Sequence, residues 1–135
     1  MAKQAGYSGT PLPKKLGIKS ESKLIVLGAP DDFFETLGTL PAGVKVGQQA
    51  RGSADRVIVF LRRARDLPRD FPRGHKVLAE GGSLWLAWPK KSSALASDIT
   101  QEQIRSAGLA AGLVDYKICA IDENWSGLCF ARRKK

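Results

Sequence analysis

The sequence predicts an α/β domain in three layers, with a mainly parallel sheet between helices and an antiparallel hairpin at its C-terminal end. Three short apolar runs have the length and continuous apolar character of strands covered on both faces. Segments with helical signals separate these runs, and such alternation implies a parallel sheet with right-handed crossovers. Two further apolar runs, 113–121 and 128–133, are joined by a short polar segment that is typical of a hairpin.

The first half of the domain begins with an expected strand at 23–29, which Pro30 ends. A helix is expected at 31–38, because two aspartates stand in its first turn, where carboxylates complement the helix dipole. A short strand at 44–46 and a polar loop follow.

The second buried strand is expected at 55–61, where β-branched residues are frequent. The segment 62–79 is expected to be helical but broken, because Pro68 and Pro72 each remove a backbone donor and clash with the preceding turn. The pair Gly81-Gly82 is interpreted as the end of this helix.

The third buried strand is expected at 83–88, closed by Pro89. Asp98 is the expected N-cap of the next helix, with Gln101 three residues later as the second member of a capping box. This helix is expected to end near residue 111, just before a glycine.

The chain of 135 residues suits a single domain, which we place at 23–135 after a basic N-terminal arm at 1–22. No apolar run has the roughly 18–20 residues needed to cross a membrane, and the first residues lack the apolar centre of a signal peptide. Two cysteines and one histidine exclude a disulfide framework and a structural zinc site, so we expect no metal and a cytoplasmic location.

The net charge of +9 is concentrated at the two ends of the chain. Residues 1–23 hold five lysines against one glutamate, and residues 132–135 are all basic, so the ends carry +4 and +4 of the total. Clustered cations bind phosphates without sequence specificity, so nucleic acid or another polyanion is one expected partner class. Solvated tails that bind nothing are the alternative.

The predicted order of strands and helices resembles that of the class I S-adenosylmethionine-dependent methyltransferases, with one strand-helix unit removed from the middle. The phrase LAEGGSLW at 78–85 resembles their helix-to-strand turn, with glutamate where they have proline. At finer grain the chain resembles a bacterial domain-of-unknown-function family, on the phrases GYSGTPLPKKLGIK, LGAPDDF, LWLAWPKK and DENWSGL. The resemblance implies a Rossmann-like, methyltransferase-like fold.

The turn after the first strand departs from that methyltransferase pattern. Several glycines normally let the backbone approach the cofactor, but here only Gly28 fits and Pro30 supplies no N–H. The carboxylate expected after the second strand is replaced by Gly47-Gln48-Gln49. We therefore expect no cofactor, and S-adenosylmethionine binding by a divergent methyltransferase is the alternative.

Ligands of open parallel sheets bind beyond the carboxyl ends of the strands, which places the expected site at three strand ends. Paired lysines beside a tryptophan suit a phosphate or carboxylate, with the ring as a stacking surface. A buried Trp88 under solvated lysines is the alternative, and Trp85, three residues earlier, faces the opposite side of the strand. The predicted site residues are Gly28, Ala29, Arg62, Trp88, Lys90 and Lys91, with Tyr7, Lys14 and Lys15 of the arm and Trp125 as further contacts.

No catalytic residue is assigned. Asp122 and Glu123 are interpreted as turn residues, His75 as a surface residue, and Cys119 and Cys129 as small thiols in the hairpin strands. The sequence thus favours a non-catalytic module that binds an anionic ligand, a nucleic acid or a protein partner.

Overall fold

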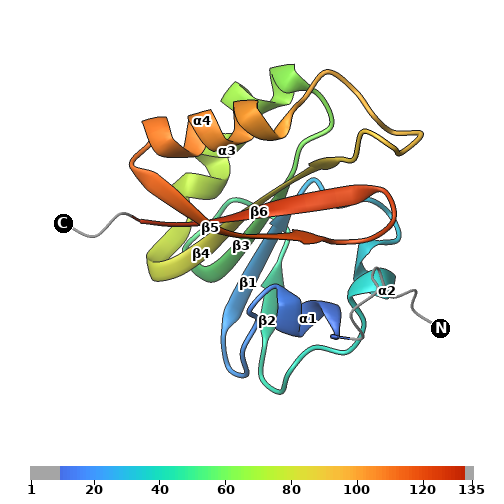
Figure 1. The fold of residues 1–135 in the computed structure, drawn as a ribbon. Coiled ribbons are helices and arrows are strands. Elements are labelled where there is room, and N and C mark those ends of the chain that lie inside the picture. Colours follow the sequence, from blue (N-terminus) through green and yellow to red (C-terminus); the bar gives the residue numbers. More distant parts are fainter. Residues whose placement is uncertain (1–9, 133–135) are drawn as a thin grey trace.

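A computed structural model, which describes residues 10–132, contains one six-stranded sheet with helices on both faces (Figure 1). The strand order is β2-β1-β3-β4-β6-β5. Strands β1 to β4 are parallel to one another, and β6 lies antiparallel between β4 and β5. The predicted α/β class, with a mainly parallel sheet and a C-terminal antiparallel hairpin, is confirmed. The strands are β1 (Lys23–Leu27), β2 (Lys45–Gly47), β3 (Ala54–Phe60), β4 (Leu78–Pro89), β5 (Leu113–Ala120) and β6 (Trp125–Arg132).

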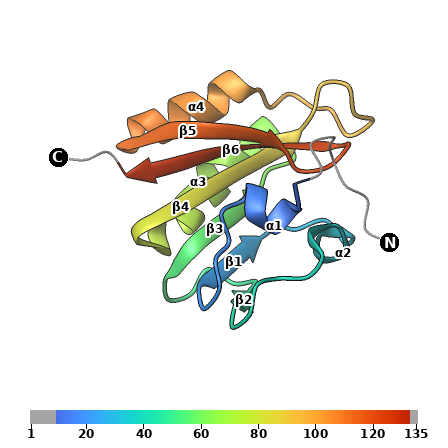
Figure 2. The same ribbon diagram turned by 60° about the horizontal axis from the view of Figure 1, so that its bottom comes forward.

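Two pairs of helices cover the two faces of this sheet (Figures 1 and 2). The longer pair, α3 (Leu67–Lys76) and α4 (Gln101–Ala110), packs on one face, and a short 3-10 turn, η1 (Ala64–Asp66), leads into α3. The shorter pair, α1 (Leu12–Lys15) and α2 (Phe33–Leu37), lies on the other face. Within residues 10–132, no helix is long and apolar enough to cross a membrane.

Alternation along the strands divides the core between the two faces. In β4, Trp88 packs in the cluster under α3 and α4, whereas Trp85 packs in the cluster under α1 and α2. The predicted opposite orientation of these two tryptophans is confirmed. Trp85 also donates from its indole nitrogen to the carbonyl of Leu16, 3.0 Å away, which ties the N-terminal segment to the sheet.

The expected boundary at residue 22 does not coincide with a break in packing. Leu16 and Ile18 are buried, and both belong to the core on the α1 and α2 face. The described part of the segment that we expected to be an arm therefore supplies apolar side chains to the domain.

The helix predicted at 62–79 is shorter than expected, and its predicted end is wrong. Pro68 stands in the first turn of α3, where a missing N–H costs nothing. The glycines 81 and 82 lie inside β4, not at a helix end. Gly82 allows a close strand approach, because a Cβ atom there would lie 2.7 Å from the carbonyl oxygen of Asp55 in β3, whereas Gly81 has a φ of +79°.

The predicted N-cap of α4 is also wrong by two residues. Thr100, not Asp98, caps this helix: its hydroxyl accepts the N–H of Gln103 at 3.2 Å, and the Gln103 side chain accepts the N–H of Thr100 at 2.8 Å. This is a reciprocal capping box. Asp98 instead accepts the backbone N–H of Ala64 at 2.9 Å, a contact that joins the loop before α4 to the start of η1.

Helix α4 approaches the sheet at Gly108, and this contact generates a stability prediction. A Cβ atom at Gly108 would lie 2.6 Å from Cδ2 of Phe130 in β6, so Gly108→Ala forces the helix away from the strand. We expect a loss of about 1–3 kcal/mol in the free energy of unfolding, measured by urea denaturation. Ser106→Ala, at an exposed position of the same helix, is the control and should change it by less than about 0.5 kcal/mol. Equal stabilities of the two variants would contradict this packing.

Candidate functional site at the carboxyl ends of the strands

The candidate site lies where the connections after β1 and β3 leave the sheet toward opposite faces. Strand β1 is followed by α2 on one face, and the neighbouring strand β3 is followed by α3 on the other. Such a reversal opens a crevice beyond the carboxyl ends of the two strands, and open α/β sheets bind ligands there.

Gly28 shapes the β1 side of the crevice. Its φ is +73°, in the left-handed region that favours glycine, and a Cβ atom would lie 3.0 Å from the carbonyl oxygen of Phe60. The chain therefore turns tightly against β3 at this point. The carbonyl oxygen of Gly28 accepts a hydrogen bond of 2.8 Å from Nη1 of Arg62.

Arg62 crosses the crevice from the β3 side. Its guanidinium carbon lies 5.5 Å from the ring centroid of Trp125, at the start of β6, in a cation–π arrangement. Its backbone N–H donates to Asp66 at 3.1 Å, and its carbonyl oxygen accepts the hydroxyl of Ser97. Because backbone and side chain are both bonded, Arg62 presents a cation in a fixed position.

Two hollows meet at Arg62. The smaller, about 250 Å³, extends from Gly28 to the first turns of α3. The larger, about 430 Å³, lies between Arg62 and Arg63 on one side and the loop before α4 on the other. The residues around the larger hollow are Arg62, Arg63, Pro89, Leu95, Ala96, Ser97, Asp98 and Trp125.

The carboxylates beside the smaller hollow are neutralised by arginines of α3. Asp70 accepts hydrogen bonds from Arg69 at 3.1 and 2.9 Å and from Arg73 at 3.3 Å. The Arg69 guanidinium holds the pKa of the Asp70 carboxyl below its usual value, although partial burial acts in the opposite direction. Asp66 pairs with Arg69 at 3.1 Å. Within residues 10–132, no carboxylate is paired with the guanidinium of Arg62 or Arg63.

The structure brings together Gly28, Arg62 and Trp125 among the residues predicted for the site. Trp88 is 6% exposed and Trp125 is 3% exposed, so each ring packs mainly in the core, as the alternative for Trp88 proposed. Trp125 nevertheless lines the larger hollow. Ala29 packs against the core on the α1 and α2 face.

Lys90 and Lys91 follow β4 on the same rim, but they do not belong to the residues lining the two hollows. The N–H of Lys90 donates to the carbonyl of Asn124 at 2.8 Å, which joins this turn to the β5–β6 connection. In that connection Asp122 accepts the N–H groups of Asn124 and Trp125, at 2.8 and 2.9 Å. The turn interpretation of Asp122 is confirmed.

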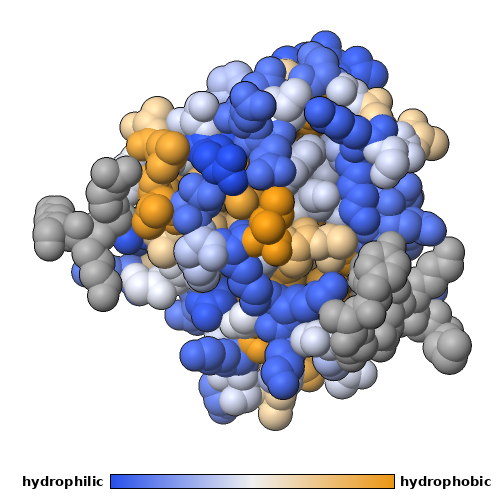
Figure 3. Space-filling model, in the orientation of Figure 1, coloured by the Kyte–Doolittle hydropathy of each residue, from blue (hydrophilic) through white to orange (hydrophobic). Residues whose placement is uncertain are grey.

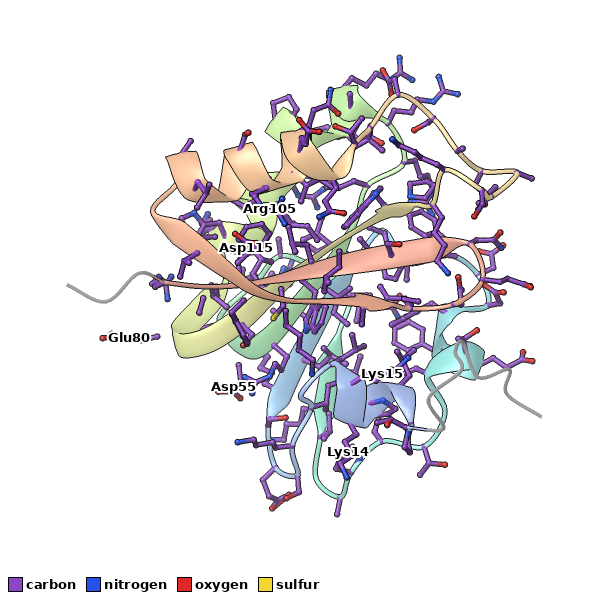
Figure 4. All side chains as sticks on the ribbon, viewed as in Figure 1. Lys14, Lys15, Asp55, Glu80, Arg105 and Asp115 are labelled. Carbon is purple, nitrogen blue, oxygen red and sulfur yellow. The ribbon has the colours of Figure 1, made fainter. Side chains whose placement is uncertain are left out.

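The lysines of the N-terminal segment lie away from the crevice. Lys14 and Lys15 belong to α1, and the carbonyl of Lys15 accepts a 2.6 Å hydrogen bond from Lys117 of β5. Figure 4 shows both lysines on the α1 side of the β5–β6 ribbon. Tyr7 lies outside the described residues.

Sequence reasoning missed the contribution of the loop before α4. Leu95, Ser97 and Asp98 come some 35 residues after Arg62, and only the tertiary fold brings them to it. The local signal in the sequence concerns the turn after β3 and not this loop. Asp66 accepts the N–H groups of Arg62 and Arg63 and so turns the chain there.

His75 is half-buried in α3, where its ring stacks on Phe71 with centroids 5.6 Å apart, so the surface interpretation holds only in part. Burial lowers the pKa of His75, and Arg132 lowers it further. The unfolded chain therefore binds the proton first, so the stability present above the unfolded pKa of about 6.5 is lost as the pH falls from there through the lower folded pKa.

We expect the free energy of unfolding to fall between about pH 7 and pH 5, and His75→Gln to flatten this slope. Urea denaturation at several pH values measures it, and the chain offers a clean comparison because it has one histidine. Asp70 titrates lower, so both proteins should lose stability together in stronger acid. Parallel pH profiles from pH 7 to pH 5 would contradict the assignment.

The four parallel strands, the C-terminal antiparallel hairpin and the crevice between β1 and β3 together define a Rossmann-like, methyltransferase-like domain. Residues 15–134 match the family described as protein of unknown function (DUF3052), and the chain belongs to this family. A search of curated proteins found no match in sequence.

Solved structures with the same fold include several methyltransferases. The pyocyanin biosynthetic protein PhzM has a TM-score of 0.63 at 11% identity, with 90% of this chain and 53% of that chain covered. This chain thus spans about half the length of PhzM. A SAM-dependent methyltransferase from Aquifex aeolicus has a TM-score of 0.60 at 12% identity, covering 87% and 85%. The magnesium protoporphyrin IX methyltransferase of Synechocystis PCC 6803, with bound SAM, has 0.58 at 10%, covering 90% and 74%. At these identities the likeness shows the fold alone.

Proposed function

We propose that this protein binds a small anionic ligand at the carboxyl ends of its parallel strands, as a non-catalytic module. The observation that carries the proposal is the position of Arg62, which is fixed at the crevice between Gly28 and Trp125 and has no carboxylate partner within residues 10–132. A guanidinium already held in place loses little entropy when it binds, and its fork matches a phosphate or carboxylate.

The larger hollow suggests the character of the ligand. Its volume of about 430 Å³ falls within the roughly 300–1,000 Å³ of small-molecule sites. Arg62 and Arg63 line one side, and Pro89, Leu95 and Trp125 supply apolar surface. A compound with an apolar body and one phosphate or carboxylate group fits this combination.

The surroundings of the hollows favour binding over catalysis. Of the carboxylates that line them, Asp66 and Asp70 are paired with arginines, and Asp98 accepts the N–H of Ala64. Among residues 10–132, no histidine or cysteine lines either hollow. A general acid or base needs a pKa near the working pH. The Arg69 guanidinium lowers the pKa of Asp70 and so moves it away from that range.

The second candidate is a divergent methyltransferase, which the fold likeness to the SAM-bound Synechocystis enzyme favours. Two local features weigh against it. The turn Gly28-Ala29-Pro30 offers few N–H groups, and the Arg62 guanidinium adds positive charge to a crevice that would have to hold a sulfonium cation.

Isothermal titration with inorganic tripolyphosphate at low ionic strength tests the anion site. We expect salt-sensitive binding, weakened roughly 10- to 100-fold in Arg62→Gln, which is the range of a lost charge-assisted hydrogen-bond pair. Lys76→Gln removes the same charge from the far end of α3 and is the matched control. No binding at low salt, or equal affinities of the wild type and Arg62→Gln, would contradict the proposal.

The thermal midpoint of unfolding with S-adenosylmethionine or S-adenosylhomocysteine separates the two candidates. A ligand at 100 times its dissociation constant stabilises the native state by about 2.7 kcal/mol, an easily measured shift. We expect no shift at millimolar concentrations of either compound. A clear upward shift would support the methyltransferase and overturn our proposal.

A further inference from the structure

A second surface, far from the crevice, lies where α1 packs beside the hairpin. Its centre is Tyr116 of the edge strand β5, which is 58% exposed. In Figure 3, apolar side chains along β5 are bordered by hydrophilic ones on this side of the molecule. Neither the anion site nor the core accounts for a tyrosine this exposed.

A β-bulge at Tyr116 separates the charges of β5 onto opposite faces. Asp115 pairs with Phe130, and Lys117 pairs with the next residue of β6, Cys129, so Tyr116 is the extra residue. In a regular strand Asp115 and Lys117 would share one face. Here Asp115 faces α4, where it pairs with Arg105 at 3.0 Å, and Lys117 faces α1. Figure 4 shows Arg105 and Asp115 across the ribbon from Lys14 and Lys15.

The hydroxyl of Tyr116 is anchored at the sheet. It lies 2.7 Å from the hydroxyl of Ser83 in β4, and it accepts the thiol of Cys129 at 3.3 Å. Because the side chain reaches across β6 to β4, the ring lies along the face of the sheet with its outer side toward solvent. An aromatic ring held flat and half covered is the geometry of a stacking platform.

Cations lie on the same face of the sheet as this ring. Arg56, next to Ser83 in the sheet, is held by a 2.8 Å hydrogen bond to the carbonyl of Gly17. Lys117 is held against the carbonyl of Lys15, and Lys14 is exposed on the same helix. Burial raises the pKa of Tyr116, and Arg56 acts in the opposite direction. Burial likewise raises the pKa of Cys119, and Lys15 and Lys117 act in the opposite direction.

We propose that this surface binds single-stranded nucleic acid, with a base stacked on Tyr116 and its backbone phosphates on Lys14, Lys15, Arg56 and Lys117. Cations that flank an exposed aromatic ring are the combination by which proteins hold unpaired bases without sequence preference. A duplex offers no free base face to the ring, so the single strand is the form that uses both features.

Fluorescence anisotropy with a labelled oligouridylate of about 12 nucleotides, within the usual site size, tests the proposal on the full chain. We expect Tyr116→Ala to weaken binding roughly 5- to 100-fold, the value of one base–aromatic stack, and Tyr116→Phe to keep most of the affinity. Lys14→Gln with Lys117→Gln should reduce the slope of log affinity against log salt by about 0.7 for each lysine.

Lys76→Gln removes one positive charge away from this surface, so it is the matched control and should not change oligonucleotide binding. Thermal unfolding of each variant shows whether it is folded, and the double lysine variant tests the surface independently of Tyr116. A duplex bound as tightly as the single strand, or an affinity unchanged in both the Tyr116→Ala and the double lysine variants, would overturn the proposal. Loss of oligonucleotide binding in Arg62→Gln would overturn it as well, by moving the site to the crevice.

Discussion

The Arg62 guanidinium is the contact on which the arrangement at the strand ends depends. It donates to the Gly28 carbonyl after β1 and lies over Trp125 at the start of β6, while its own backbone is bonded to Asp66 and Ser97. One side chain thus links segments that are far apart in the sequence. The same contact separates two hollows and leaves a fixed cation at the wall of each.

Backbone conformation and charge act together in this arrangement. Only a residue with positive φ turns the chain away from β1 so close to β3, and Gly28 supplies it. That turn directs a carbonyl oxygen toward Arg62, so the position that carries a glycine-rich cofactor loop in related folds here holds an arginine contact. The scaffold is retained, and the residues at its strand ends differ from that pattern.

The sequence predicted the features that depend on local pattern and missed those that depend on distant contacts. The buried strands follow from continuous apolar runs, and their alternation placed Trp85 and Trp88 on opposite faces. The Gly81-Gly82 pair resembles a helix end locally, but it lies inside β4, where Gly82 is required by the approach of β3. Two residue pairs, Asp98 with Gln101 and Thr100 with Gln103, have the spacing of a capping box. The second pair caps α4, because Asp98 accepts the distant N–H of Ala64. The bulge at Tyr116 has no local signal, since it arises from pairing with β6.

The most direct test of the anion site is a titration of ¹⁵N-labelled protein with inorganic pyrophosphate, followed by amide and arginine Nε resonances. Our account predicts that the largest shift changes occur at Gly28, Arg62, Arg63 and Ser97, and that they saturate together with one affinity. Changes confined to α1 and β5, or no saturable change around Arg62, would contradict the central claim that this arginine is the anion-binding centre of the domain.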